Sequence, residues 1–110
     1  MYEQREIVII PFPYSDLTAT KQRPALIISN EKLNLSEDRI CCLITSNTPQ
    51  EGILLNQSIE DGNLPFKSWV KPHRLFTVSE NVIRKKVGTI SSALHQKIIH
   101  ELGTYIGETK

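Results

Sequence analysis

Arg23, Thr45 and Ser46 are polar residues at the ends of short apolar runs, where their side chains could act together. Arg23 stands directly before a proline and an apolar run in KQRPALIIS, so a permanently charged guanidinium lies at the entrance to an expected core strand. Thr45 and Ser46 end a second run, ICCLITS, and add two hydroxyl groups. Such groups can stabilise negative charge during a reaction. Each also has a structural explanation, because Arg covers apolar edges with its stem and Thr suits strands.

A second candidate group lies in the segment SWVKPHRLFTV, which alternates like a strand. Alternation would place Trp69, Lys71 and His73 on one face and put Val70 and Phe76 together on the other. Two polar groups beside an aromatic ring could form a site. An ordinary exposed strand face has the same pattern, so the pattern alone leaves both readings open.

Metal and cofactor chemistry finds little support in the sequence. His73, His95 and His100 are scattered, and the last two are five residues apart, so they do not share a helix face. Neither a glycine-rich phosphate loop nor a GxSxG turn occurs. Cys41 and Cys42 are neighbours that point to opposite faces of a strand, so we expect two small buried thiols rather than a disulfide or metal site. A reaction would then rely on acid, base and charge stabilisation by ordinary side chains, with no cofactor.

Length and composition predict one folded domain over residues 1–110. Apolar residues make up 39% and charged residues 23%, which is ordinary globular usage and excludes a disordered or fibrous chain. No apolar run approaches the roughly 18 residues that span a bilayer, and the N-terminus lacks the pattern of a signal peptide. We therefore expect a cytoplasmic protein.

The charges are unevenly distributed along the chain. A net charge of +1 is too small for general attraction to nucleic acid. Between residues 66 and 90, however, Glu80 is the one acidic residue against Lys67, Lys71, Arg74, Arg84, Lys85 and Lys86. This predicts a basic half of the surface, although a run such as 84–86 is by default a solvated loop.

Short runs rich in Ile and Val predict buried strands. Strands are expected at residues 7–12, 24–29, 40–45, 68–78 and, more briefly, within 52–58. Pro72 cannot donate to a ladder, so the fourth of these must be an edge strand, contain a bulge or divide into two strands. Residues 30–39 read as a surface connection and 60–65 as a turn.

One helix is expected, at the C-terminus. Ser91 is a capping residue for SALHQKIIHELGTYI, and Gly107 ends the helix. Its apolar stripe comprises Leu94, Ile98, Leu102 and Tyr105 or Ile106. The elements together predict a mainly β fold, a small and strongly bent antiparallel sheet or barrel with this helix packed on it.

Three segments resemble a known family when they are read in order. REIVIIPFPYSDLTATKQRPALIIS, CCLITSN and SWVKPHRLFTV are similar, at comparable spacing and over essentially the whole chain, to the PemK/MazF toxins of bacterial toxin-antitoxin systems. The resemblance implies an SH3-like barrel with a C-terminal α-helix, a homodimer and a cognate antitoxin partner. It also implies a metal-independent endoribonuclease that cuts single-stranded mRNA at short sequence motifs, leaving a 2′,3′-cyclic phosphate and a 5′-hydroxyl.

The resemblance also assigns roles to residues. It places Arg23 and Thr45 at the active site, where a guanidinium and hydroxyls, including that of Ser46, would stabilise charge on the phosphoryl oxygens. Some relatives carry an Arg and an Asp where this chain has Lys71 and His73. His73 is then a candidate base, because it titrates near neutral pH, and Lys71 can hold a phosphate as a point charge.

Two further residues are candidates for substrate binding. Asp16, in the first long loop, could shape the RNA groove, and Trp69 could stack on a base. Trp69 could equally be a core or dimer residue. Arg5 replaces a glycine that usually precedes the first strand in the family, which affects only the turn that enters it.

Two other functions remain open. The first is a toxin of the same fold that binds DNA gyrase, although such relatives use an aromatic and apolar C-terminus and this chain ends YIGETK. The second is a catalytically inactive autoregulatory dimer, which the exchanges at Lys71 and His73 would suit. Gyrase trapped on DNA without RNA cleavage would favour the first.

Overall fold

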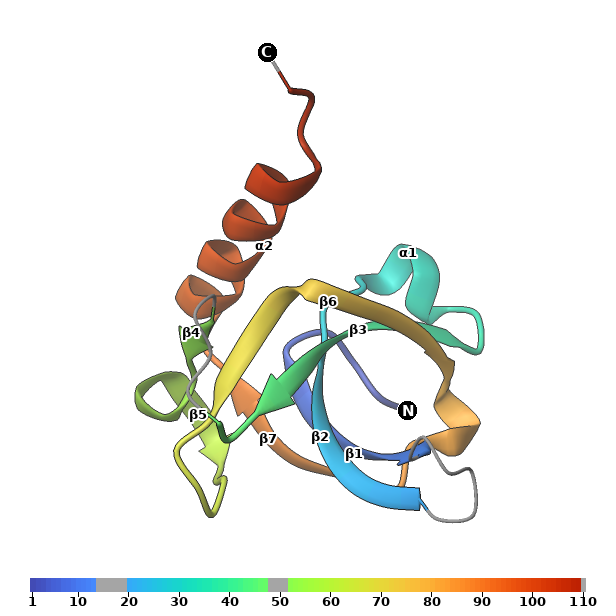
Figure 1. The fold of residues 1–110 in the computed structure, drawn as a ribbon. Helices are drawn as coiled ribbons and strands as arrows, with labels where there is room; N and C mark the ends of the chain where they lie inside the picture. Colours follow the sequence, from blue (N-terminus) through green and yellow to red (C-terminus); the bar gives the residue numbers. More distant parts are fainter. Residues whose placement is uncertain (14–19, 48–51, 110) are drawn as a thin grey trace.

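Seven antiparallel strands form one strongly curled sheet in the part of the chain that the structure describes, residues 1–13, 20–47 and 52–109 of a computed structural model (Figure 1). The strands are β1 (Glu6–Pro13), β2 (Thr20–Ile27), β3 (Asp38–Thr45), β4 (Ile53–Leu54), β5 (Ile59–Gly62), β6 (Trp69–Ser79) and β7 (Lys85–Ile90), in the spatial order β4-β6-β3-β2-β1-β7-β5. Helix α1 (Glu31–Asn34) is one turn, and α2 (Ser92–Ile106) follows β7. Two 3₁₀ turns, η1 (Asn56–Ser58) and η2 (Glu80–Val82), join strands.

The predicted fold class, a mainly β curled sheet with a C-terminal helix, is confirmed. The strands expected at 7–12, 24–29, 40–45 and 68–78 correspond to β1, β2, β3 and β6. Strands β5 and β7 were not expected, because IEDG carries two acids and KKVGTI begins with two lysines. Within 52–58 the strand is only two residues long, and the connection at 30–39 holds α1.

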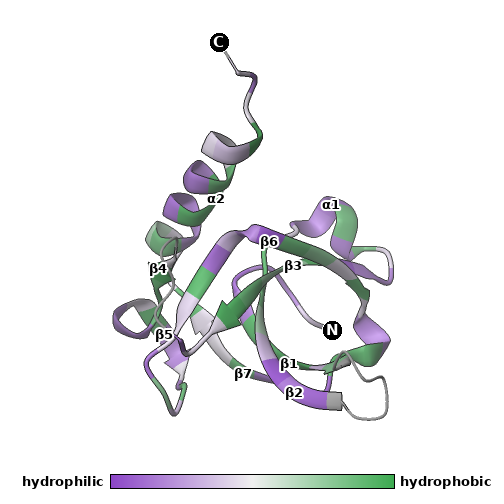
Figure 2. Cartoon of the chain, viewed as in Figure 1, coloured by the Kyte–Doolittle hydropathy of each residue, from purple (hydrophilic) through white to green (hydrophobic). Residues whose placement is uncertain are grey.

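Apolar side chains are buried on both faces of the sheet, and Figure 2 shows the hydrophobic stretches along its central strands. The helix-side cluster, which includes α2, is built on Ile7, Leu26, Cys42, Ile44, Val70, Leu94 and Ile98. The far-side cluster is built on Val8, Ile10, Ala25, Ile27, Cys41 and Ile83, with Phe12 and Phe76 packed against it. Adjacent residues of β1, β2 and β3 thus alternate between two cores, as side chains of a strand must.

The two cysteines divide between these cores. Cys41 and Cys42 are fully buried and free. Burial raises the pKa of each thiol to about 12, so both are neutral. The prediction of two small buried thiols is confirmed.

Strand β6 contains a bulge at its proline. Lys71 pairs with Leu43 of β3, and the next pair along the ladder joins Leu75 to Cys42. Residues 72–74 of β6 are therefore left out of the regular ladder. Pro72 has no N–H to donate, which explains the position of the bulge. The expectation that 68–78 alternates throughout is therefore wrong, because Val70 joins the helix-side cluster and Phe76 the far-side cluster.

Helix α2 begins and ends as predicted. The Ser91 hydroxyl accepts from the N–H of Leu94 at 3.1 Å, and the N–H of Gly107 donates to the carbonyl of Gly103 at 2.8 Å. Leu94 and Ile98 are buried, but Tyr105 is 44% exposed, and the last turns project beyond the barrel (Figure 1). The apolar stripe therefore packs on the barrel from Leu94 to Leu102, which is partly buried against the helix-side cluster.

A buried cation ties the N-terminal segment to the rest of the barrel. Arg39 is fully buried, and its guanidinium donates to the carbonyls of Tyr2, Ser36 and Asp38 at 2.8–2.9 Å. Its Nη2 also lies 2.9 Å from a carboxylate oxygen of Glu80. Every arm of this guanidinium thus has an acceptor, as a buried cation requires. None of the described helices has the length and apolar character needed to cross a membrane.

Candidate functional site

Arg23 and Thr45 lie at the ends of two strands that separate. Strands β2 and β3 pair from Ile27 with Cys41 to Ala25 with Leu43, and beyond that point their ends diverge (Figure 1). Proline at position 24 supplies no N–H to continue the ladder. The last paired residues, Ala25 and Leu43, lie two positions from Arg23 and Thr45, so the two site residues follow the point where the strands separate and are not themselves paired.

Thr45 comes together with two other predicted site residues. In the ladder between β3 and β6, Thr45 is opposite Trp69, and Leu43 is opposite Lys71. Residues directly opposite one another share a face, so Thr45, Trp69 and Lys71 form one group. The Thr45 hydroxyl accepts from the N–H of Asn47 at 3.2 Å, which fixes the oxygen and leaves its hydrogen to be donated.

The bulge of β6 turns His73 toward α2. Its ring centroid lies 5.4 Å from that of Tyr105, and the ring is exposed. No contact among the described residues joins His73 to Arg23 or Thr45. Asp16, the remaining predicted site residue, lies outside the described residues.

A pocket of about 410 Å³ opens between the separating ends of β2 and β3. Its lining residues include Arg23 and Ser46 of the predicted site, together with Lys21, Phe66 and Lys85. We call it the Arg23 pocket. Among the described residues that line it are three cations and no Asp or Glu, so its electrostatic character favours an anion.

The sequence did not single out Lys21, Phe66 or Lys85 as site residues. Lys85 belongs to the basic run at 84–86, which by itself predicts a solvated loop. It lies instead at the start of β7, opposite Ile9 of β1. Phe66 stands in the loop before β6, where no local pattern marks it. Only the long-range approach of this loop to β2 brings these side chains to Arg23.

Ion pairs neutralise part of the basic half of the surface. The Nζ of Lys86 lies 3.5 Å from Glu6 and 3.6 Å from Asp61. In contrast, Lys21, Arg23 and Lys85 form no ion pair with any residue that the structure describes. The Arg23 pocket therefore keeps a positive charge that the neighbouring surface has partly lost.

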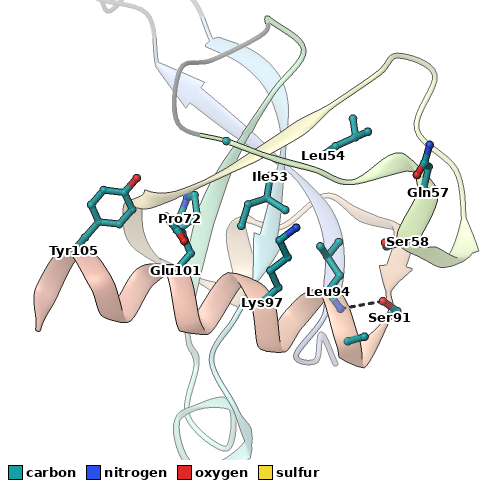
Figure 3. Close-up of a pocket in the computed structure, with 12 residues that line it drawn as sticks. Ile53, Leu54, Gln57, Ser58, Pro72, Ser91, Leu94, Lys97, Glu101 and Tyr105 are labelled. Carbon is teal, nitrogen blue, oxygen red and sulfur yellow. Dashed lines mark hydrogen bonds between the residues drawn. The ribbon is translucent and has the colours of Figure 1, made fainter.

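A larger pocket, of about 670 Å³, lies between α2 and β4 (Figure 3). Ile53 and Leu94 form apolar parts of its wall, and Lys97 and Glu101 project from successive turns of α2. These two are its charged side chains among the described residues, and they have opposite signs, so the pocket offers no net attraction for a phosphate. None of the predicted site residues lines it, and we do not take it as the site.

No three His, Cys, Asp or Glu residues within 1–13, 20–47 and 52–109 are grouped closely enough to hold a metal ion. The predicted site residues that the structure describes supply guanidinium, ammonium, hydroxyl, imidazole and indole groups.

Comparison with known proteins identifies the family. Residues 3–106 match the family described as the PemK-like, MazF-like toxin of type II toxin-antitoxin systems. This chain belongs to that family, as its sequence predicted. No curated protein matches it at the level of sequence.

Solved structures of similar fold agree with this assignment. A mycobacterial endoribonuclease in complex with its cognate antitoxin is 17% identical, with a TM-score of 0.74 over 100% of this chain and 99% of that one. The Mycobacterium tuberculosis toxin MazF-mt6 is also 17% identical, with a TM-score of 0.75 over 96% and 100%. A MazE-MazF structure from Deinococcus radiodurans is 15% identical, with a TM-score of 0.73 over 98% of both chains. At these identities the similarity establishes the fold.

Proposed function

We propose that this protein is a cytoplasmic toxin that cleaves single-stranded mRNA at short sequence motifs without a metal ion. Membership of a toxin family and a fold shared with proteins named as endoribonucleases support this activity. The observation that carries the proposal is the placement of Arg23. It is a cation without an ion pair among the described residues, and it lines a positively charged pocket together with Ser46, the residue that follows Thr45.

The reaction needs only groups that this chain has. The ribose 2′-oxygen attacks the neighbouring phosphorus, the bond from phosphorus to the 5′-oxygen breaks, and the products are a 2′,3′-cyclic phosphate and a 5′-hydroxyl. One proton leaves the 2′-hydroxyl and one reaches the 5′-oxygen, so no water is consumed. Arg23 would donate two directed hydrogen bonds to the phosphoryl oxygens as charge develops there, and Thr45 and Ser46 would add neutral donors.

We assign the base to His73 and a phosphate contact to Lys71. An RNA strand that lay along β6 would meet Trp69 and Lys71 on one face and would have to pass the bulge to reach His73. Because the His73 ring lies beside Tyr105, it can act only on RNA that extends toward α2. Trp69 would stack on a base, and Asp16 would contact RNA from the first loop.

Partners follow from the family. We propose a cognate antitoxin, since one related structure is an endoribonuclease in complex with its cognate antitoxin. We also propose a homodimer, which the resemblance to the PemK/MazF toxins implies. An acidic, disordered antitoxin tail would lie over Arg23 and Lys71 and compete with RNA for the same positive charge.

The direct test uses purified protein, single-stranded RNA and EDTA. We expect cleavage in EDTA, fragments that end in a cyclic phosphate, and no cleavage where the nucleotide at the cut carries a 2′-deoxy sugar. Continued cutting of the deoxy substrate would rule out attack by the 2′-hydroxyl. Mapping the fragment ends from one long RNA would give the sequence motif.

The alternative of a gyrase-binding toxin draws on one observation. At the projecting end of α2, Tyr105 is 44% exposed and Ile106 is 71% exposed, which is the kind of surface such a toxin would need. Gyrase trapped on DNA by a protein that leaves RNA intact would favour this function over the nuclease.

A further inference from the structure

Phe66 is an exposed aromatic residue on an ordered backbone. Its side chain is 70% exposed, in the loop between β5 and β6. A single exposed apolar residue is unremarkable by itself. What distinguishes Phe66 is how the chain beneath it is held and what it stands beside.

Hydrogen bonds fix the loop at the base of Phe66. Its carbonyl accepts from the hydroxyl of Ser68 at 2.8 Å and from the side-chain amide of Asn56 at 3.2 Å. The Asn56 side chain in turn accepts from the N–H of Ser68 at 2.7 Å, and Ser68 is buried. The ring is therefore presented on a backbone that has little conformational freedom left to lose when something binds.

Phe66 lines the Arg23 pocket together with three cations. Lys21, Arg23 and Lys85 supply positive charge, and Phe66 supplies an aromatic surface. A nucleotide needs both, because its phosphate pairs with cations and its base stacks on an aromatic ring. A volume of about 410 Å³ lies within the usual range for small-ligand sites.

Asn63 gives the same pocket a means of reading a base. Its backbone N–H donates to the carbonyl of Val87 at 3.2 Å, which holds the residue against β7. The side-chain amide carries both a donor and an acceptor, the pattern that pairs with the edge of a base. Asn63 and Phe66 line the same pocket, so one bound nucleotide could meet both residues.

We propose that the Arg23 pocket is a nucleotide subsite in which Phe66 stacks on one base of the RNA, next to the cleaved bond, and Asn63 reads the edge of that base. The inference rests on the proposed ribonuclease function and names a part of its substrate-binding site. It assigns sequence preference at one position of the RNA to the loop between β5 and β6.

The test measures binding of an RNA that carries the mapped motif and a 2′-deoxy sugar at the cut, so that it binds without being cleaved. Wild type, Phe66→Ala and Phe66→Trp are compared, with Leu75→Ala as a matched control. Leu75 is also a partly exposed apolar residue, and it does not line the pocket. Phe66→Ala should weaken binding by about 5- to 150-fold, the range for loss of one stacked base, and Phe66→Trp should restore it. Equal melting temperatures would show that the variants fold.

A set of RNAs, each abasic at one position near the cut, identifies the base concerned. At one position, removing the base should weaken RNA binding to wild type by the same factor as the Phe66→Ala substitution does. In Phe66→Ala, removing that same base should cause no further loss of binding. Asn63→Ala should relax the motif at that position when fragment ends are mapped with cleavable RNA.

The outcomes separate this inference from the proposed function. If wild type cleaves RNA but Phe66→Ala binds as tightly as wild type, or if no abasic position couples to Phe66, the subsite is wrong and the nuclease stands. If wild type cleaves no unmodified single-stranded RNA, the nuclease is wrong. Binding of one unmodified RNA to wild type, Phe66→Ala and Phe66→Trp then decides the subsite.

Discussion

Thr45 of β3 and Trp69 of β6 face each other as a directly opposed pair in the antiparallel ladder. The pair puts a hydroxyl at the end of one strand beside an indole at the beginning of the other. Lys67 adds a cation, with its Nζ 5.8 Å from the centre of the indole ring. A hydrogen-bond donor, an aromatic surface and a positive charge therefore meet where β3 leaves the sheet.

The hydroxyl of Thr45 should matter for the rate of RNA cleavage. Thr45→Val keeps the shape of the side chain and removes the donor, so kcat should fall about 5-fold, as expected for one hydrogen bond of about 1 kcal/mol. Thr45→Ser should retain most of the activity. Single-turnover cleavage measures the effect, and Thr77→Val, at an exposed threonine of β6, is the control. Full activity in Thr45→Val would remove Thr45 from the mechanism.

Arg23 should contribute more than Thr45, because it carries a full charge. Arg23→Ala should lower kcat by about 10²- to 10³-fold, the loss typical of one donor to a developing oxyanion. Arg23→Lys should recover only part of the rate, since an ammonium lacks the planar fork. The control is Arg74→Ala, an exposed arginine in the bulge of β6. Equal losses in the Arg23 and Arg74 variants would indicate a general effect of charge rather than a role in the reaction.

The buried Arg39 should govern stability and not catalysis. Arg39→Ala leaves the carboxylate of Glu80 without its cation and three backbone carbonyls without their donor. The free energy of unfolding should fall by about 2–5 kcal/mol, because a large, fully buried side chain is truncated and its hydrogen bonds to the backbone are lost. Urea unfolding at one fixed protein concentration measures this, because a dimer would make stability depend on concentration. A change below about 0.5 kcal/mol, the value expected for Arg74→Ala, would contradict it.

His95 should make stability depend on pH. Burial is the main effect that lowers the pKa of His95 below its usual value of 6.5. A hydrogen bond with the backbone of Ile28 raises this pKa, and the positive charge of Arg5 lowers it. Its Nε2 is buried with no hydrogen-bond partner among the described residues, so a proton there would be unpaired. The unfolded chain takes up this proton first as pH falls. The free energy of unfolding should therefore decrease from about pH 7.5 downward, until the folded His95 is also protonated.

The measurement is urea unfolding of wild type and His95→Gln at several pH values between 7.5 and 5. The variant should lack the part of the slope that belongs to His95, while His100→Gln, at an exposed histidine of the same helix, should keep it. Identical slopes in wild type and His95→Gln would show that burial does not disfavour the protonated ring.

Much of the fold could be predicted because it depends on local patterns. Apolar runs marked β1, β2, β3 and β6, and a capping serine with a terminal glycine marked α2. Strands β5 and β7 were not predicted because they are rich in polar residues. They lie at one end of the sheet, where a strand is stabilised by pairing with its neighbour more than by apolar side chains. The prediction of which β6 side chains share a face was wrong after Pro72. The proline indicated a bulge but not its length, and a bulge of three residues exchanges the two faces of the strand that follows.

In the candidate site, too, the features that depend on local pattern could be predicted and those that depend on long-range contacts could not. That Thr45 shares a face with Trp69 and Lys71 follows from strand alternation and one register. The position of His73 does not, because it depends on the bulge that carries the ring to Tyr105. The Arg23 pocket depends on contacts between segments that are far apart in the chain, and no single stretch of sequence encodes it.

The two neutral thiols, one in each core, allow local unfolding of the barrel to be measured by chemical labelling without an added probe. Cys41 and Cys42 are inaccessible in the native state, so a maleimide reagent can reach either of them only when the barrel opens. Labelling at Cys42 without Cys41 would mean that α2 lifts from the sheet while the far-side cluster stays intact. Simultaneous labelling would mean that the two layers come apart as one cooperative unit.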